Sequence, residues 1–330
     1  MKKDQKIYVV TLPNGYFGST GCTWRSLDPE KITTGLSARG ASVTVVPVDK
    51  LLSIQLKQDD IVIYTSSAEP NIRAYIRDVM YFVEKKCQII PRYELLLAHE
   101  NKGFQQLCRD QYGFGNLKGG YVFDVDNLPK YFPFVYKNVT GAGSSGVSLA
   151  RSQADVEKIR KRDFRPGMKR RAINLARRLK LTEKEYQIYG YRHKGFNLSV
   201  YQQFIPDLAC DYKVLVFFDK IFVLRRRVRK NDFRASGSGK FTFEKPPVEL
   251  LDFAADIFSR LGSPYASLDI AVKGSEAYLI EYQCMNFGPY TLINSPGHYV
   301  KRDGDWAYIE GRSDLEECFS YALTNFIDFK

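Results

Sequence analysis

Residues 267–286, SLDIAVKGSEAYLIEYQCMN, predict a β-hairpin that carries two opposed carboxylates. SLDIAV and AYLIEYQ alternate in character and are rich in β-formers, so both predict strands, and KGSE supplies the turn. A three-residue loop, GSE, pairs Lys273 with Ala277 and sets Asp269 directly across from Glu281. Opposed residues of an antiparallel pair have Cα atoms roughly 4.5–5.5 Å apart. The segment therefore requires an antiparallel sheet and concentrates negative charge on it.

This pair of carboxylates predicts a metal site. Asp269 and Glu281 repel each other across the hairpin unless a cation lies between them. Gln283 points to the same face as Glu281, because side chains alternate along a strand, and it adds a neutral oxygen ligand. Carboxylate and amide oxygens without His or Cys suit Mg²⁺ first. The alternative is a pair of solvated charges on the outer face of an edge hairpin.

The N-terminal part of the chain predicts a different kind of sheet. Within residues 1–95, KIYVVTL, ASVTVVPV, DIVIYTSS and CQIIP predict strands, and 28–39 and 71–85 predict helices between them. This alternation is typical of a small α/β layer with parallel strands. Residues 95–112 predict one helix that contains Lys102. The 330 residues exceed the usual single-core limit of roughly 250–300, so we expect two or three compact units.

Composition bounds the class of protein. No apolar stretch is long enough to span a bilayer, and we expect a cytoplasmic protein. Six cysteines without a C-x-x-C pair indicate reduced, mostly buried thiols, and three isolated histidines argue against a zinc site.

The net charge of +12 is concentrated in one segment. Residues 158–180 hold eleven Lys/Arg and one acid, Asp163. After Pro166 and Gly167, an apolar seam with helical spacing predicts an amphipathic helix with a basic outer surface. This helix is either a solvated face or a docking surface for an anionic partner. We favour an acidic glycan or peptide. Nucleic acid has no dedicated signature here, and for a membrane surface the seam lacks large aromatics.

Residues 134–147, FVYKNVTGAGSSGV, predict a strand followed by a phosphate-binding loop. The loop contains Gly141, Gly143 and Gly146, which allow backbone N–H groups to approach phosphate oxygens closely. Ser144 and Ser145 add hydroxyls, and Lys137 on the strand supplies a point charge. The pattern differs from a Walker A loop, which ends in Gly-Lys-Ser/Thr, and from the G-x-G-x-x-G fingerprint. A flexible turn is the alternative for the loop taken alone.

This loop resembles that of the ATP-grasp ligases, in the branch that includes the ribosomal protein S6 glutamate ligase. The resemblance continues in order through YQQFIPDLACDYKVLVFFDKIFVLRR, which is similar to the family's hinge strand and two hydrophobic strands, and through RRRVRKNDFRAS to the carboxylate hairpin. It implies an α/β (α+β) ATP-grasp fold with a small N-terminal parallel α/β domain. It implies that ATP is bound by Lys102, Lys137, Gly143, Ser144, Ser145, Gly146, Val147, Gln203, Phe204, Ile205, Asp211 and Lys213.

The same resemblance implies catalytic and metal residues. Arg226 and Arg234 correspond to the arginines that hold phosphate and acyl phosphate. Asp269 and Glu281 correspond to the Mg²⁺ carboxylates, and the third ligand is either Gln283 or Asn286. The chain departs from the family at three positions, since Gln203 replaces a glutamate, Ser236 an asparagine and Gln283 an asparagine.

The resemblance implies a domain at 1–97 and an ATP-grasp domain at 98–330. The latter divides into 98–205, with the phosphate loop and a basic helical insertion at about 151–194, and a metal and substrate subdomain at 206–330. The implied activity is ATP- and Mg²⁺-dependent joining of a carboxylate to an amine through an acyl phosphate, with release of ADP and phosphate. Two alternatives stay open, a non-catalytic ATP-binding protein that docks a polyanion and a kinase built on the same fold.

Overall fold

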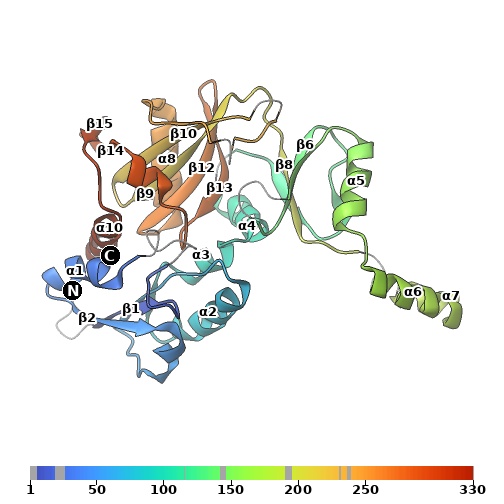
Figure 1. Ribbon diagram of the computed structural model, residues 1–330, viewed down its shortest axis with the longest axis horizontal. Helices are drawn as coiled ribbons and strands as arrows, with labels where there is room; N and C mark the ends of the chain where they lie inside the picture. The colour runs from blue at the N-terminus through green and yellow to red at the C-terminus, as the bar shows by residue number, and fades with distance from the viewer. Residues whose placement is uncertain are drawn as a thin grey trace. The chain divides into compact units, whose positions relative to one another are not determined.

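The computed structural model describes residues 6–18, 27–114, 116–141, 146–189, 195–229, 232–235 and 239–329. By packing, the chain divides into two compact units (Figure 1). The first comprises Met1–Glu100, Tyr112–Asn116 and Asp207–Lys330, and the second comprises Asn101–Gln111 and Leu117–Pro206. The domain boundaries expected from the sequence stay a prediction. None of the helices in the described part is long and apolar enough to cross a bilayer.

The first unit contains the parallel layer predicted from the sequence. Its strands are β1 (Lys6–Thr11), β2 (Ser42–Pro47), β3 (Ile61–Ile63) and β4 (Gln88–Ile90), in the order β2-β1-β3-β4 and all parallel. Its connections include α1 (Pro29–Ala38), η2 (Val48–Ser53) and α2 (Pro70–Val83). α1 and α2 both begin with a proline that follows an acidic N-cap residue. The Asp28 side chain accepts from the Glu30 amide, and the Glu69 side chain accepts from the Ile72 amide.

The first unit also contains a seven-stranded antiparallel sheet. Its order is β13-β12-β9-β10-β14-β15, with β11 paired to β10. The strands are β9 (Cys210–Phe217), β10 (Lys220–Arg227), β11 (Phe241–Thr242), β12 (Tyr265–Lys273), β13 (Glu276–Gln283), β14 (Gly297–Arg302) and β15 (Asp305–Glu310). The helices of this part are α3 (Tyr93–Ala98), α8 (Val248–Leu261), α9 (Tyr290–Asn294) and α10 (Leu315–Phe329).

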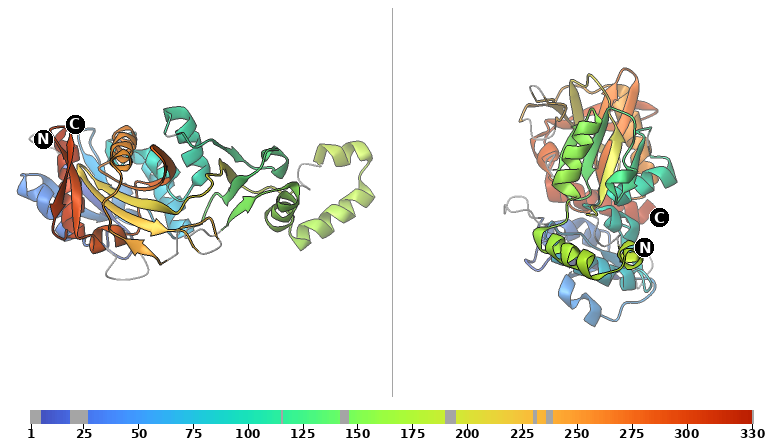
Figure 2. Two further views of the ribbon diagram at one scale, coloured as in Figure 1. Left: turned by 90° about the horizontal axis from the view of Figure 1, so that it is seen from above. Right: turned by 90° about the vertical axis from the view of Figure 1, so that its right-hand side faces the viewer.

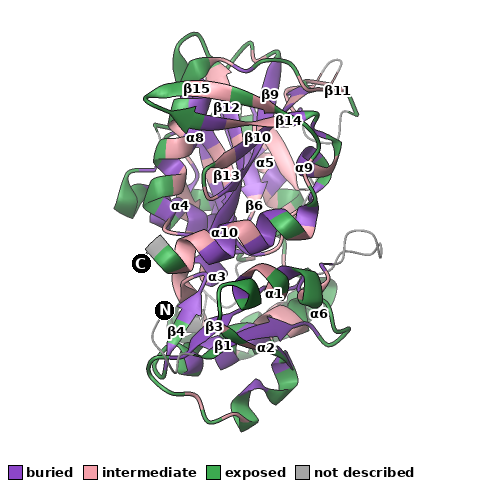
Figure 3. Cartoon of the chain, turned by 90° about the vertical axis from the view of Figure 1, so that its left-hand side faces the viewer, coloured by how far each residue is buried: buried purple, intermediate pink, exposed green. Residues whose placement is uncertain are grey.

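One hydrophobic core joins the two sheets of the first unit. It includes Ile7 and Val9 of β1, Phe217 of β9, Tyr265 of β12 and Phe319 of α10. Phe319 lies 5.1 Å from the Phe217 ring and 4.6 Å from the Tyr265 ring, centroid to centroid, within the range in which aromatic pairs attract. Figure 3 shows this burial on β9, β12 and α10. The core therefore gives rigid support to the strands that carry the predicted metal residues.

The β12–β13 hairpin confirms the predicted opposition of Asp269 and Glu281, but its turn was predicted wrongly. Lys273 pairs with Glu276 rather than with Ala277, so the turn has two residues. Gly274 opens it with φ +61°, as expected for a first turn residue that needs left-handed backbone. A bulge follows where the register shifts between Asp269 and Ile270. The shorter turn and the extra bulge residue cancel, and Asp269 still faces Glu281.

The second unit is a smaller antiparallel sheet with helices. Its order is β5-β8-β6-β7, with β5 (Gly119–Val122), β6 (Phe134–Asn138), β7 (Val147–Ala150) and β8 (Ser199–Gln203). Its helices are α4 (Lys102–Tyr112), η3 (Val125–Asn127), α5 (Gln153–Asp163), α6 (Met168–Lys180) and α7 (Glu183–Tyr189). The basic insertion is thus helical, as predicted. The single helix predicted over 95–112 was wrong, since α3 and α4 are separated at 99–101, where Glu100 has φ +52°.

Candidate active site

A cluster of four buried or half-buried charges lies on three neighbouring strands of the large sheet. Arg226 of β10 pairs in register with Asp211 of β9, and Lys213 of β9 pairs with Asp269 of β12. The Arg226 guanidinium donates to both carboxylate oxygens of Asp211, from Nε at 2.7 Å and from Nη2 at 3.0 Å. It also reaches Asp269, with Nη2 3.1 Å from Oδ2. The predicted residues on these strands therefore form one contiguous network.

Asp269 is the member of the cluster that both cations share. Lys213 Nζ lies 2.9 Å from its Oδ1, and Arg226 lies against its other oxygen. Burial disfavours its charged form, but Arg226 and Lys213 outweigh that effect and hold the pKa of Asp269 well below its usual range. Asp269 is therefore ionised at neutral pH and is an oxygen donor for a cation. Because β12 lies between β9 and β13, Asp269 also faces Glu281 on the opposite side.

Gln283 connects Glu281 to a histidine that the sequence did not single out. Its Nε2 lies 3.3 Å from Glu281 Oε1, and its Oε1 lies 2.9 Å from Nδ1 of His99 and 3.4 Å from the Glu100 amide. His99 is buried, and this burial lowers the pKa of its imidazole to about 4. The ring is neutral at pH 7, and the roles of donor and acceptor between it and the amide depend on its tautomer.

The donor set fits a hard divalent cation. Asp269 and Glu281 lie on the facing strands of one hairpin and present carboxylate oxygens, which suit Mg²⁺. Gln283 adds its oxygen when its amide group turns over, because here its NH2 group faces Glu281 and its oxygen faces His99 and the Glu100 amide. Within the described ranges, no three His, Cys, Asp or Glu side chains form a metal-binding group. A metal here therefore relies on two carboxylates and an amide. The Asn286 side chain lies near Gly18, since a β-carbon built on Gly18 would be 3.7 Å from its Oδ1.

Arg234 forms its ion pair with Asp232 and not with a member of the charge cluster. Its Nη2 is 2.6 Å from Oδ2 of Asp232, and its Nε donates to the same carboxylate. This carboxylate raises the pKa of the arginine through a hydrogen bond. The predicted departure at Ser236 lies outside the described residues. The catalytic role expected for Arg234 stays a prediction.

In the second unit, two lysines flank the predicted phosphate loop. Lys102 Nζ donates to the carbonyl of Gly141 at 2.7 Å, and Lys137 of β6 pairs in register with Val147 of β7. Both lysine residues are buried. Gly143, Ser144 and Ser145 lie outside the described residues. Lys102 and Gly141 are 39 positions apart in sequence, and their contact places the lysine at the start of the loop. The binding of ATP by Lys102 stays a prediction.

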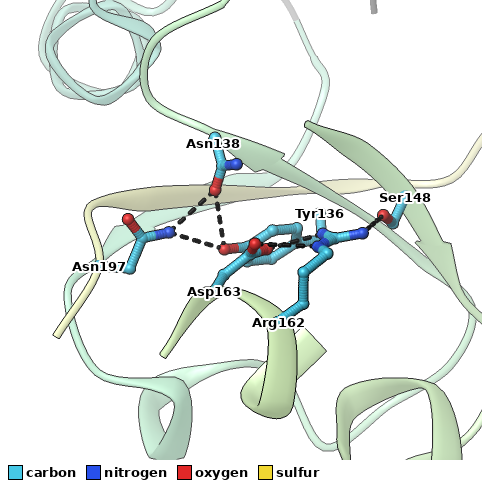
Figure 4. A network of polar contacts seen from close by, with 6 residues as sticks. All are labelled: Tyr136, Asn138, Ser148, Arg162, Asp163 and Asn197. Carbon is cyan, nitrogen blue, oxygen red and sulfur yellow. Dashed lines mark hydrogen bonds and ion pairs between the residues drawn. The ribbon is translucent and has the colours of Figure 1, made fainter. Parts of the chain in front are cut away.

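A polar network anchors the stem of this loop, and the sequence analysis missed it (Figure 4). Asn138 Oδ1 accepts from the Tyr136 hydroxyl at 3.1 Å and from Asn197 Nδ2 at 2.9 Å, and Asn197 Nδ2 also donates to the Tyr136 hydroxyl. Arg162 of α5 donates to Ser148 of β7 at 3.0 Å. Burial raises the pKa of Tyr136 to about 12, so its hydroxyl stays protonated as a donor.

Gly146 closes the loop against this network. Its carbonyl accepts from the Asn138 amide at 3.1 Å, and its φ of +72° is one that residues with a side chain rarely adopt. A β-carbon on Gly146 would lie 2.7 Å from Asn138 Nδ2. This position therefore requires glycine for conformation and for space.

The hinge residues are Gln203, at the end of β8, and the following Phe204 and Ile205. The Gln203 amide donates to the Lys118 carbonyl at 2.7 Å, which fixes the strand end. Gln203 is exposed, and Phe204 and Ile205 are half-buried. Their predicted contact with adenine stays a prediction.

Comparisons with solved structures agree on the fold. The D-cycloserine synthetase DcsG is 11% identical, with a TM-score of 0.55 over 98% of this chain and 99% of that one. The ATP-grasp ligase PsnB, solved with a minimal precursor, is 14% identical, with a TM-score of 0.51 over 91% of this chain and 96% of that one. A RimK-domain ATP-grasp protein from Sphaerobacter thermophilus is 13% identical, with a TM-score of 0.49, covering 86% and 92%. No protein-family model and no curated protein matches. The chain has the ATP-grasp fold, with an N-terminal parallel α/β layer.

Proposed function

We propose that this chain, with its ATP-grasp fold, is an ATP- and Mg²⁺-dependent ligase that joins a carboxylate to an amine. The observation that carries the proposal is the charge cluster of Asp211, Lys213, Arg226 and Asp269, which meets Glu281 across the hairpin. Two of the similar structures are named as a synthetase and a ligase, which supports this class of reaction.

The chemistry sets an electrostatic demand that these residues meet. The carboxylate substrate attacks the γ-phosphorus of ATP, the bond to ADP breaks, and an acyl phosphate forms. The amine then attacks the acyl carbon, phosphate leaves with the bonding electrons, and the amine loses a proton. Triphosphate and carboxylate repel each other at the first step, so positive charge must be supplied before reaction.

Each group of residues has a separate task in this proposal. Asp269, Glu281 and Gln283 would hold Mg²⁺, which offsets phosphate charge when bound. We favour Gln283 over Asn286 as the amide ligand, because the Gln283 side chain lies 3.3 Å from Glu281, and a turn of its amide group would bring its oxygen to the metal in place of its NH2 group. Arg226 and Lys213 balance the negative charges of Asp269 and Asp211 and would stabilise the phosphoryl group during its transfer. Arg234 would hold the acyl phosphate. In the second unit, Lys102, Lys137 and the loop amides would bind the phosphates of ATP.

The substrate and the compartment belong to the same proposal. We propose an acidic glycan or peptide as the carboxylate substrate, because a uronic acid or glutamate side chain suits amide formation. The five cysteines that the structure describes are buried and form no disulfide bond, which a reducing compartment such as the cytoplasm allows.

The test follows ADP release with hydroxylamine as the amine. An acyl phosphate is intercepted by hydroxylamine as a hydroxamate, so a ligase forms hydroxamate in proportion to ADP when its carboxylate is present. Candidate carboxylates are screened in this assay with ATP and Mg²⁺. A stable phosphorylated product without hydroxamate would identify a kinase instead. ATP binding with no ADP release for any carboxylate would favour the non-catalytic alternative.

A further inference from the structure

The α6 helix carries an apolar face that no part of the described structure covers. All side chains of α6 are exposed except half-buried Asn174. Met168, Leu175 and Leu179 are 84%, 64% and 82% exposed, values that a packed helix would not show. Figures 1 and 2 show α6 and α7 as a helical pair that extends away from the sheet of the second unit. An isolated helix of 13 residues is marginal in water, so a partner is expected to stabilise it.

The cations of the basic segment separate into two groups in the structure. On α5, Lys158 pairs with Asp155 at 3.0 Å, Arg160 with Asp126 at 2.9 Å and Arg162 with Asp163 at 2.7 Å. On α6, none of the six Lys/Arg forms an ion pair with a described residue, and the helix itself contains no acid. The six cations of α6 are therefore not neutralised by acids of the described structure, whereas three of the four cations on α5 are paired.

The arrangement around α6 separates apolar and basic side chains. With about 100° between successive residues, one arc of the helix holds Met168, Ala172, Leu175, Ala176 and Leu179. The edges of this arc are basic on both sides, with Lys169 and Lys180 along one edge and Arg171 and Arg178 along the other. Long basic side chains at such edges extend away from the apolar face and keep their charges in a polar layer.

We infer that α6 binds the surface of an anionic lipid membrane, lying flat with its apolar arc among the acyl chains. A basic amphipathic helix of this kind matches both properties of such a surface, its negative charge and its apolar interior. An acidic glycan would leave the two leucines in water. A second copy of α6 would oppose six cations with six like charges. The arc holds no aromatic residue, so binding depends strongly on charge and on anionic lipid.

The experiment is sedimentation of the full chain with vesicles, without nucleotide. The chain is expected to pellet with phosphatidylcholine vesicles that contain phosphatidylglycerol, and to stay in solution with phosphatidylcholine alone. Raising the salt from low to high concentration should weaken binding, because the charges are screened. Replacing two cations, Arg171→Gln with Arg178→Gln, should weaken binding about 25-fold, at about fivefold per cation. Leu175→Ser with Leu179→Ser should weaken it at least about tenfold.

A charge-matched control uses cations elsewhere in the second unit. Lys130→Gln with Lys161→Gln removes the same net charge from exposed side chains outside α6 and should leave binding unchanged. The variants on α6 replace exposed side chains, of which Arg178 contacts the Tyr186 ring of α7, and far-UV circular dichroism checks that they fold. Three results would overturn the inference. They are equal binding to both kinds of vesicle, wild-type binding by the leucine variant, and a loss of binding in the lysine control as large as that in the arginine variant. Binding to polyglutamate without binding to anionic vesicles would assign α6 to an acidic polymer instead.

Discussion

At the scale of single residues, Asp269 and Glu281 are two like charges held in opposition by the hairpin. Asp269 is balanced by Lys213 and Arg226, whereas Glu281 contacts the amide of Gln283. Changing Glu281 therefore removes an oxygen donor for a cation and leaves the ion pairs of the charge cluster intact.

We predict that Glu281→Gln abolishes Mg²⁺-dependent turnover while the fold persists. The loss in kcat/KM should exceed the roughly 10–100-fold typical of an outer partner of a metal ligand, because the ligand itself is removed. ADP release at increasing Mg²⁺ measures it. The matched control is Glu276→Gln, the same chemical change at the exposed first residue of β13. Full activity in Glu281→Gln would contradict the metal assignment.

His99 is a positioning residue in this arrangement, because it acts on the metal through Gln283. Replacing it by phenylalanine keeps an aromatic ring and removes the hydrogen bond to Gln283 Oε1. We predict that His99→Phe weakens the apparent Mg²⁺ affinity by about 10–100-fold and leaves ATP binding without metal unchanged. Isothermal titration with each ligand measures both. An unchanged Mg²⁺ affinity would assign His99 to packing alone.

The same variant tests the pH dependence of stability. Burial lowers the pKa of His99 from 6.5 to about 4 in the folded state. The unfolded chain therefore binds a proton at His99 more readily than the folded chain does. The stabilising contribution of neutral His99 to the free energy of unfolding is present above about pH 6.5 and is lost as the pH falls toward 4. Urea unfolding of wild type between pH 7 and 4 should show this loss. His99→Phe should show a flatter profile over the same interval, and parallel profiles would argue against it.

At the scale of elements, the phosphate loop depends on the stem formed by β6 and β7. The stem is held by the register of Lys137 with Val147 and by the contacts of Asn138 with Tyr136 and Asn197. A change at Gly146 acts on both the backbone and this network, whereas a carbon added to Gly167 would meet no heavy atom within 4 Å.

We predict that Gly146→Ala destabilises the loop and weakens ATP binding. Left-handed backbone costs a residue with a side chain about 1–2 kcal/mol, and the added carbon meets Asn138. Thermal unfolding and ATP titration measure the two effects. Gly167→Ala is the matched control, because Gly167 has a negative φ and no heavy atom within 4 Å of the added carbon. Equal behaviour of the two variants would mean that the loop tolerates alanine at position 146.

At the scale of the whole molecule, the residues that we propose for the phosphates of ATP and those that we propose for the metal belong to different units. Lys102 and Lys137 belong to the second unit, and Asp211, Lys213, Arg226, Asp269 and Glu281 to the first. Binding of Mg²⁺ with ATP should therefore stabilise the chain more than ATP alone.

We predict that ATP with Mg²⁺ raises the thermal unfolding temperature by several degrees. Ligand at about 100 times its Kd stabilises by roughly 2.7 kcal/mol, which corresponds to such a shift for a protein of this size. Mg²⁺ alone and ATP alone are the controls. No shift with ATP and Mg²⁺ together would count against a nucleotide site in this chain.

Local patterns in the sequence predicted much of the fold and part of the site. The alternation of predicted strands and helices indicated the parallel layer. The hairpin pattern predicted the pairing of Asp269 with Glu281, although the turn was predicted wrongly and a bulge compensates for the difference in register. The helix expected over 95–112 was wrong as well, because Asn101 was not recognised as the N-cap of α4, where its side chain accepts from the Phe104 amide. The break at 99–101 places His99 beside Gln283.

The sequence by itself determined which segments form strands and helices, because apolar periodicity and turn residues act over a few neighbouring positions. It also determined the opposed carboxylates and the lysine near the phosphate loop. Only the tertiary structure decided that Arg226 bridges Asp211 and Asp269 and that His99 meets Gln283 across 184 positions. It likewise decided that three of the four cations on α5 form ion pairs, while none on α6 pairs with a described residue. The reason is that such contacts follow from the order of strands in a sheet and the packing of helices on it, which long-range burial selects and no local pattern encodes.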